Sequence, residues 1–256
     1  VLHLRLGIVH ELLGDQTDAR ADYQTAAKLD PHSVAPLLRL GRLLREVGAT
    51  REAILAFHAA AQRDPSEPEA WLGSGVCREE IGDLQGARAD FEQAQLLGLL
   101  QAEPLLALGD LDAREHDLKS ALRRYQAATK LAPENATAFV KLGNALVRDH
   151  AAMQAVSAFR KAVELAPDLA QAHNGLGAAL VALGESSAAA TELSAAATLD
   201  LHDPNPLLNL ALLRRRSGDE AGAQLAFAQA KARAPELELA ALTAPAGRRA
   251  SAARRP

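Results

Sequence analysis

The stretch LGNALVRDHAAMQAVSAFRKAVELAP, residues 142–167, decides how this chain folds. Its glycine at 143 is followed twelve residues later by Ala155, then by Phe159 and by Ala162, and Pro167 ends the stretch. Spacings of four and three place both alanines and the ring on one face of a helix. Proline disfavours further helix, because it lacks the N–H donor and restricts the residue before it. The stretch therefore predicts a helix with a small-residue face that another helix can approach closely.

The same pattern returns every 34 residues along the chain, which is the first sign of a repeat protein. The glycine recurs at Gly7, Gly41, Gly75, Gly109, Gly143 and Gly177, with Ala211 continuing the series. The bulky residue sixteen positions later recurs as Tyr23, Phe57, Phe91, Tyr125, Phe159, Leu193 and Phe227. No insertion or deletion interrupts this register. We therefore divide the chain into seven units, 1–33, 34–67, 68–101, 102–135, 136–169, 170–203 and 204–237, followed by a tail at 238–256.

Each unit is predicted to form two helices joined by a turn. In the fifth unit Leu142, Leu146 and Val147 share the face of a first helix, and the alanine–ring stripe marks the second. Glycines suited to a helix C-cap stand between the two helices at Gly14, Gly48, Gly82, Gly184 and Gly218. One helix pair cannot bury its apolar face alone, whereas stacked neighbours can. We expect an all-α solenoid.

Composition supports an all-α fold and disfavours several classes of function. The chain is 48% hydrophobic but only 3% aromatic, and its single cysteine, Cys77, excludes an internal disulfide framework and a multi-cysteine metal site. Residues 238–256 carry a charge of +3 against −4 for the whole chain, so the remainder carries −7. An acidic body is poorly suited to holding nucleic-acid phosphates. No apolar run is long enough to predict a membrane span, and the basic tail is predicted to be disordered.

The register resembles the tetratricopeptide repeat. That signature has a bulky residue at unit position 4, Leu-Gly at 7–8, Ala at 20, an aromatic at 24, Ala at 27 and Pro at 32. Trp71 and Phe139 match position 4, where His3 and His173 depart from it. The resemblance implies a right-handed superhelix whose concave groove is lined by positions 2, 5, 6, 9, 12 and 13 of the first helices. Pentatricopeptide repeats, which bind RNA, have a 35-residue period and are disfavoured. No polar capping helix is evident, so further repeats upstream are expected.

No motif predicts catalysis, a cofactor or a metal site. The eight histidines lack zinc-ligand spacing, and no nucleophile elbow or phosphate-binding loop is present. Cys77 is interpreted as a buried packing residue rather than a nucleophile. All eight aromatic residues occupy position 4 or 24 and are assigned to helix packing. The segment His173 to Gly177 falls inside a predicted first helix, so its two glycines cannot form a phosphate loop.

The predicted function therefore rests on the groove surface. We expect leucines to bury apolar side chains of a protein or peptide partner, arginines to pair with its acidic groups, and asparagines to bind its backbone. Ordinary solvated helix faces are the alternative interpretation of the same residues. The family's clamp for acidic chaperone tails is matched only at Asn144, so such binding is not expected. The candidate groove residues are Arg5, Leu38, Arg39, Arg42, Arg45, Leu72, Leu106, Asp110, Lys141, Asn144, Asn174 and Asn209.

Two functions remain open from the sequence. The first is a non-enzymatic scaffold that binds a peptide or helix of a protein partner, with no nucleic acid, metal or cofactor. The second, suggested by the resemblance, is the targeting arm of a larger enzyme such as a glycosyltransferase or sulfotransferase. A catalytic domain in the full reading frame would favour the second function.

Overall fold

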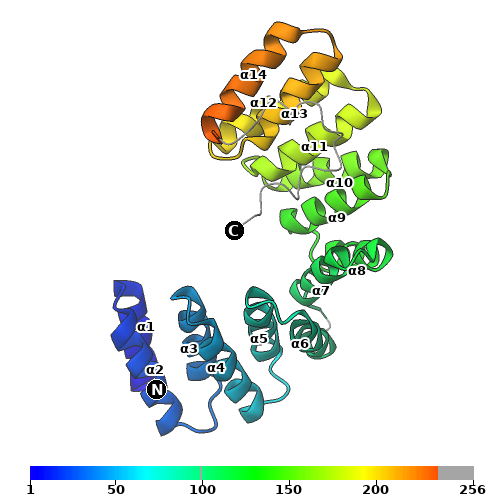
Figure 1. The fold of residues 1–256 in the computed structure, drawn as a ribbon. Coiled ribbons are helices and arrows are strands. Elements are labelled where there is room, and N and C mark those ends of the chain that lie inside the picture. The colour runs from blue at the N-terminus through cyan, green and yellow to red at the C-terminus, as the bar shows by residue number, and fades with distance from the viewer. Residues whose placement is uncertain (99, 236–256) are drawn as a thin grey trace. The chain divides into compact units, whose positions relative to one another are not determined.

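The computed structural model describes residues 1–98 and 100–235, and this part of the chain consists of α-helices joined by short turns (Figure 1). The predicted tail at 238–256 lies outside the described residues. The prediction of an all-α repeat fold is confirmed. The helices are α1 (Leu2–Leu13), α2 (Gln16–Leu29), α3 (Ala35–Glu46), α4 (Thr50–Arg63), α5 (Pro68–Glu80), α6 (Leu84–Leu97), α7 (Glu103–Arg114), α8 (Leu118–Leu131), α9 (Ala136–Arg148), α10 (Ala152–Leu165), α11 (Ala170–Leu183), α12 (Ser186–Leu199), α13 (Asn205–Arg216) and α14 (Glu220–Arg233).

The helices belong to two compact bodies. The first body, Val1–Ala132, contains α1 to α8, and the second body begins at Pro133 and contains α9 to α14. Within each body a first helix packs on the second helix of its own unit and on the second helix of the unit before it, as α3 does on α4 and α2. Each predicted helix pair therefore stacks on its neighbours.

The turn between the helices of a unit requires a left-handed residue. Gly14, Gly48, Gly82, Gly184 and Gly218 have φ between 78° and 83°. The two units without a glycine there use His116 and His150, with φ of 67° and 60°. Both histidines bear the cost of a side chain in a conformation that glycine adopts freely. The turn geometry is thus kept even where the sequence lacks its usual residue.

The recurring glycine at position 8 of each unit allows a close approach of ring and backbone. A Cβ built on Gly41 would lie 2.8 Å from Cε1 of Phe57, and one built on Gly143 would lie 2.7 Å from the same atom of Phe159. No real Cβ could occupy either place without moving the ring. The ring at position 24 also meets position 6 of the next unit, because a Cβ on Gly73 would lie 2.5 Å from Phe57. The ring therefore fills the junction between three helices.

Buried charges join neighbouring helices in the first body. Asp112 is 4% exposed, and its carboxylate accepts from Nη1 of Arg88 at 2.9 Å and from Nε of Arg124 at 2.7 Å. Asp90 is 5% exposed and accepts from Oγ of Ser74 at 2.6 Å. Because a buried carboxylate is costly unless it is paired, these contacts constrain how α5, α6, α7 and α8 pack.

Candidate functional site

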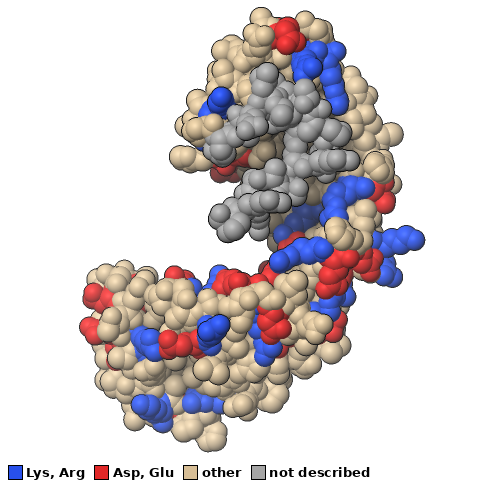
Figure 2. Space-filling view, in the orientation of Figure 1, with Lys and Arg blue, Asp and Glu red and all other residues tan. Residues whose placement is uncertain are grey.

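The first helices of the first body carry charges that pair between consecutive repeats. Nη1 of Arg39 lies 3.9 Å from a Glu11 carboxylate oxygen, and Nε of Arg45 lies 3.5 Å from Glu80. Arg42 forms an ion pair with Glu69. Figure 2 shows acidic and basic side chains lying next to one another over this body. A partner with acidic groups would have to compete with these glutamates for three of the predicted arginines.

The predicted groove leucines, Leu38, Leu72 and Leu106, lie in or against the hydrophobic core. Leu38 and Leu106 are each 8% exposed, and Leu38 is part of the cluster that contains Phe57. Leu72 is half-buried and packs against the cluster of Phe91 and Leu108. The structure thus places these leucines in internal packing rather than on a free lining surface. Among the other predicted residues, Arg5 is exposed, and Asp110 accepts a hydrogen bond from the Tyr125 hydroxyl at 2.7 Å.

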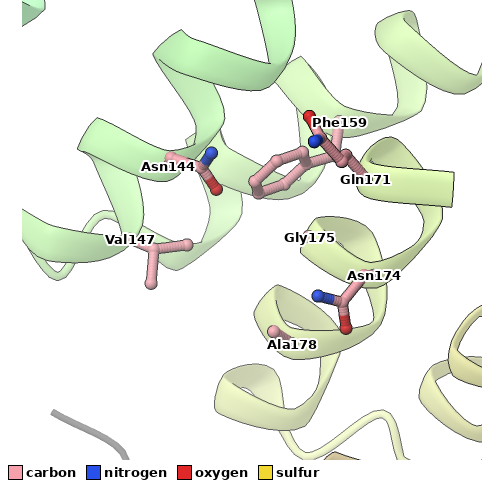
Figure 3. A pocket seen from close by; sticks show the side chains of 7 residues that line it. All are labelled: Asn144, Val147, Phe159, Gln171, Asn174, Gly175 and Ala178. Atoms are coloured by element: carbon pink, nitrogen blue, oxygen red, sulfur yellow. The ribbon is translucent and has the colours of Figure 1, made fainter. Parts of the chain in front are cut away.

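The second body contains a hollow of about 330 Å³ between its first helices. Asn144 and Val147 on α9 form one side, and the Phe159 ring from α10 lies at its floor (Figure 3). The opposite side comes from α11. The complete lining is Asn144, Val147, Phe159, Gln171, Asn174, Gly175 and Ala178. Apart from the Phe159 ring, these residues occupy unit positions 2, 5, 6, 9 and 12.

Gly175 opens this hollow onto the ring. A Cβ at that position would overlap the Phe159 ring, so α11 can lie against the ring only without a side chain there. From the sequence, Phe159 is predicted only to pack between helices and not to line a binding surface. The signal that could have revealed it is a position-24 ring followed by a glycine at position 6 of the next unit.

A hydrogen bond between two predicted residues orients the polar side of the hollow. Nδ2 of Asn209 on α13 donates to Oδ1 of Asn174 on α11 at 3.0 Å. With its oxygen occupied, Asn174 turns its Nδ2 toward the hollow (Figure 3). Asn144 is exposed on the opposite side, with Lys141 half-buried one turn before it. The structure therefore brings together Asn144, Asn174 and Asn209 on three successive first helices.

The hollow carries donors and acceptors but no ionised group. Its seven lining residues are amides, apolar residues and one glycine. His173, which neighbours Asn174, bonds elsewhere: its Nδ1 lies 2.6 Å from Glu192, and its Nε2 lies 3.0 Å from the Pro167 carbonyl oxygen. That histidine anchors α11 to the preceding turn and to α12. The arrangement suits hydrogen bonding to a neutral polar chain such as a peptide backbone.

The side chains of Cys77, His3 and His10, which could serve catalysis or metal binding, are buried or engaged in contacts within the fold. Cys77 is fully buried, and burial raises the pKa of its thiol to about 11, so it stays protonated at neutral pH. His3 and His10 both direct Nδ1 at Asp22, at 2.7 and 2.9 Å. Within residues 1–98 and 100–235 no group of three or more His, Cys, Asp or Glu side chains could hold a metal ion. In the same part of the chain, no helix is both long and apolar enough to span a bilayer.

Solved structures with the same fold are numerous. A chain of the APC/C hetero-tetramer Cut9-Hcn1 matches 93% of this chain with 21% identity and a TM-score of 0.73, and this chain covers 47% of its length. YrrB, described as a TPR protein with an unusual peptide-binding site, matches 72% of this chain with 22% identity and a TM-score of 0.58, over 95% of its own length. PilF of Pseudomonas aeruginosa matches 85% of this chain with 20% identity and a TM-score of 0.70, over 95% of its own length.

Family comparison agrees with the structures. No curated protein matches the chain. Two forms of the tetratricopeptide repeat match it, one at residues 2–33 and the other at 38–101, 106–170 and 140–206. These matches cover well over half of the sequence and fall on the stacked helix pairs. The chain therefore belongs to the tetratricopeptide-repeat family.

Proposed function

We propose that this protein is a non-enzymatic scaffold that binds an extended segment of a partner protein in the hollow of its second body. Family membership supports a protein-interaction scaffold in general. The observation that carries the finer proposal is the row of amides at Asn144, Asn174 and Asn209 beside the apolar floor of Phe159. YrrB, which shares the fold, is described as having a peptide-binding site.

Each of these groups has a role in the proposed binding. Asn209 holds the Asn174 amide in one orientation, so the Nδ2 of Asn174 is available to donate to a partner carbonyl without a further loss of rotamer freedom. Asn144, on the opposite side, offers both a donor and an acceptor. An uncharged partner side chain would lie against Phe159, because no lining residue could neutralise a buried charge.

Two further parts of the proposal concern the rest of the chain. An acidic partner segment would bind the arginines of α3 in the first body by displacing their glutamate partners. Charge reversal of Arg39 and Arg42 tests that surface.

The alternative function is that of a targeting arm of a larger glycosyltransferase or sulfotransferase. The full reading frame tests this alternative.

Capture of partners by variants of the full chain tests the hollow. Asn174→Ala removes the oriented donor, and Ala178→Leu fills the hollow from α11. We expect Asn174→Ala to weaken binding of the captured partner's peptide by about fivefold, since one hydrogen bond contributes on the order of 1 kcal/mol. Ala178→Leu should weaken it at least as much, because the added side chain occupies the hollow. Mass spectrometry identifies the partner, and fluorescence anisotropy with its synthetic peptide gives the affinity.

The matched control is Gln154→Ala, which changes an exposed amide on α10 outside the hollow. It should bind the peptide as the wild-type chain does. If Asn174→Ala, Ala178→Leu and the control all retain full affinity, the partner binds elsewhere and the assignment of the hollow is wrong.

A further inference from the structure

A histidine on α11 contacts two groups that can only accept a hydrogen bond. Nδ1 of His173 lies 2.6 Å from a carboxylate oxygen of Glu192 on α12, and Nε2 lies 3.0 Å from the carbonyl oxygen of Pro167. An ionised carboxylate and a carbonyl have no proton to donate, and a neutral imidazole has a single N–H. Both contacts are therefore hydrogen bonds only when the ring carries a proton on each nitrogen.

The repeat provides an internal comparison for one of these contacts. Trp71 stands at the same unit position as His173, and its Nε1 donates to the carbonyl of Pro65 at 3.1 Å. In both units the acceptor lies six residues before the ring. An indole nitrogen is a donor only, so a side chain at this position can donate to the preceding turn. Nε2 of His173 makes the equivalent bond, which leaves Nδ1 as the nitrogen whose proton can leave.

The charges around this ring favour its protonated form. Each of α11 and α12 carries one ionisable side chain, His173 and Glu192, and these are 12% and 25% exposed. The N-terminus of α11 opposes a cation nearby, but the short contact with the carboxylate is stronger, because hydrogen bonds between ionised groups are about twice as strong as neutral ones. The other charged side chains on the helices and turns next to α11 are Lys141, Arg148, Arg160, Lys161, Glu164, Asp168, Glu185, Arg214, Arg215 and Arg216.

The two contacts of His173 hold a helix start that has no capping side chain. Leu169 is the N-cap residue of α11 and makes no side-chain hydrogen bond, whereas Asn135 caps α9 by accepting from the Ala138 N–H at 3.1 Å. A helix without such a cap is less stable in its first turn. The ring of His173 instead attaches this turn to the Pro167 carbonyl and to α12.

The hollow is lined by the same turns of α11. Gln171, Asn174, Gly175 and Ala178 contribute to its lining, and Asn174 directly follows His173 in the sequence. Gly175 lies so close to the Phe159 ring that a Cβ would overlap it. A displacement of the start of α11 would therefore move both the oriented donor of Asn174 and the backbone that lies against the floor of the hollow (Figure 3).

We propose that His173 is a pH-sensitive positioning residue of the hollow. Where it concerns binding, this rests on the proposed function. The protonated ring fixes α11 to α12 and to the preceding turn. Loss of the Nδ1 proton leaves a lone pair facing the Glu192 carboxylate, which releases the start of α11 and disorders the lining. Because histidine changes its charge between about pH 5 and pH 8, the ordered hollow belongs to the acidic end of this range and is lost as the pH rises.

Amide exchange of the full chain tests this role without a partner. We expect the protection of residues 170–178, corrected for the intrinsic pH dependence of exchange, to fall about tenfold from pH 6 to pH 8, because a hydrogen bond between ionised groups is lost. Protection of α9 should stay constant. Glu192→Gln should abolish the fall, since a glutamine amide can donate to the unprotonated Nδ1. His173→Phe, which places at this position the residue that Phe139 provides in the fifth unit, should give low protection at both pH values.

Nitrogen NMR reads the proton directly. The ring of His173, assigned by the loss of its signals in His173→Phe, should carry protons on both nitrogens at pH 6 and on Nε2 alone at pH 8. Wild-type protection of α11 that is equal at both pH values would overturn the proposal. An equal fall in the wild type and in Glu192→Gln would also overturn it, because the carboxylate would then have no part in the effect.

The synthetic peptide of the captured partner tests the consequence for binding. Its affinity for the wild-type chain should fall about tenfold from pH 6 to pH 8 and should stay constant for Glu192→Gln. If Asn174→Ala weakens the peptide but the wild-type affinity does not change with pH, His173 does not control the site and the proposal is overturned. If the exchange result is as expected but Asn174→Ala leaves the affinity unchanged, the positioning of α11 is supported and the proposed function is wrong.

Discussion

At the scale of single residues, two arginines join consecutive repeats through the backbone. Arg63 donates from Nη1 to the carbonyls of Asp30 and Ser33 at 3.1 and 2.7 Å, and from Nη2 to that of Ala27 at 2.7 Å. Arg233 makes the equivalent three bonds, 170 residues later, to Ala197, Asp200 and Asp203. Both stand at unit position 30. Each guanidinium satisfies carbonyls at the end of the preceding second helix that have no helical partner.

Arg63→Ala should lower the free energy of unfolding of the first body by about 1–3 kcal/mol, because three carbonyls lose a charged donor. Arg63→Lys should recover little of this loss, since an ammonium cannot reproduce the planar fork. Urea unfolding followed by circular dichroism measures both, with Arg51→Ala at an exposed residue of α4 as the control. Equal stability of the wild type and Arg63→Ala would show that the carbonyls are satisfied by water.

Asp22 provides a pH-dependent contact between α1 and α2. The hydrogen bond from His3, assisted by that from His10, holds the pKa of Asp22 below its usual 3.8. The carboxylate binds a proton less readily in the folded chain than in the unfolded chain. Its contribution to the free energy of unfolding is therefore complete above about pH 5 and is lost as the pH falls through the lowered pKa.

Asp22→Asn should therefore reduce the loss of stability between about pH 5 and pH 3, and should destabilise the chain most at the upper end of that range. The measurement is the difference in urea midpoint between the variant and the wild type across the range. Asp18→Asn, at an exposed residue of the same helix, should show no such pH dependence. A difference that does not change with pH would contradict the role given to His3 and His10.

At the scale of helices, a buried carboxylate sets how three helices meet. Asp112 on α7 lies between Arg88 of α6 and Arg124 of α8, and Arg124 also donates to Gln95 at 3.2 Å. Leucine occupies the equivalent position in α3, where Leu44 is 3% exposed. The same position of the repeat thus joins helices by packing in one unit and by charge in another.

Asp112→Ala should cost about 3–5 kcal/mol of unfolding free energy, because it leaves two half-buried guanidinium groups without their shared partner. Glu115→Ala removes an exposed partner of Arg88 and should cost only about 0–1 kcal/mol. Chemical denaturation of the two variants makes the comparison. Similar losses for both would mean that water reaches the arginines and replaces the buried carboxylate.

At the scale of the whole molecule, stability is distributed along the repeats. Each helix pair contacts only its neighbours, so a helix covered on one side opens more easily than one covered on both. Amide exchange should therefore be faster in α1, whose Leu2 and Val9 are exposed, than in α3, whose equivalent residues are buried. Native-state exchange read by mass spectrometry tests this. Equal protection of α1 and α3 would indicate that something covers α1 in solution.

The repeat register could be predicted well from the sequence. A 34-residue period, glycines at position 8 and rings at position 24 specify the helix pairs, their turns and the residues that must be small, because those requirements act over short distances along one helix. Even the turns at His116 and His150 follow from the period, although no glycine marks them. The candidate site was harder to predict, since it depends on which side chains already have partners.

Tertiary packing alone decided those partners. Arg39, Arg42 and Arg45 look available in the sequence, yet their glutamates come from neighbouring repeats, 27 to 35 residues away. Leu38 and Leu106 are predicted to line a groove, yet packing against neighbouring helices leaves each only 8% exposed. The hollow at Asn174 arises because Gly175 lies against Phe159 and Asn209 holds the amide in place. A period along the chain specifies which helices stack. The space and the free donors left between them depend on side chains that meet only after stacking.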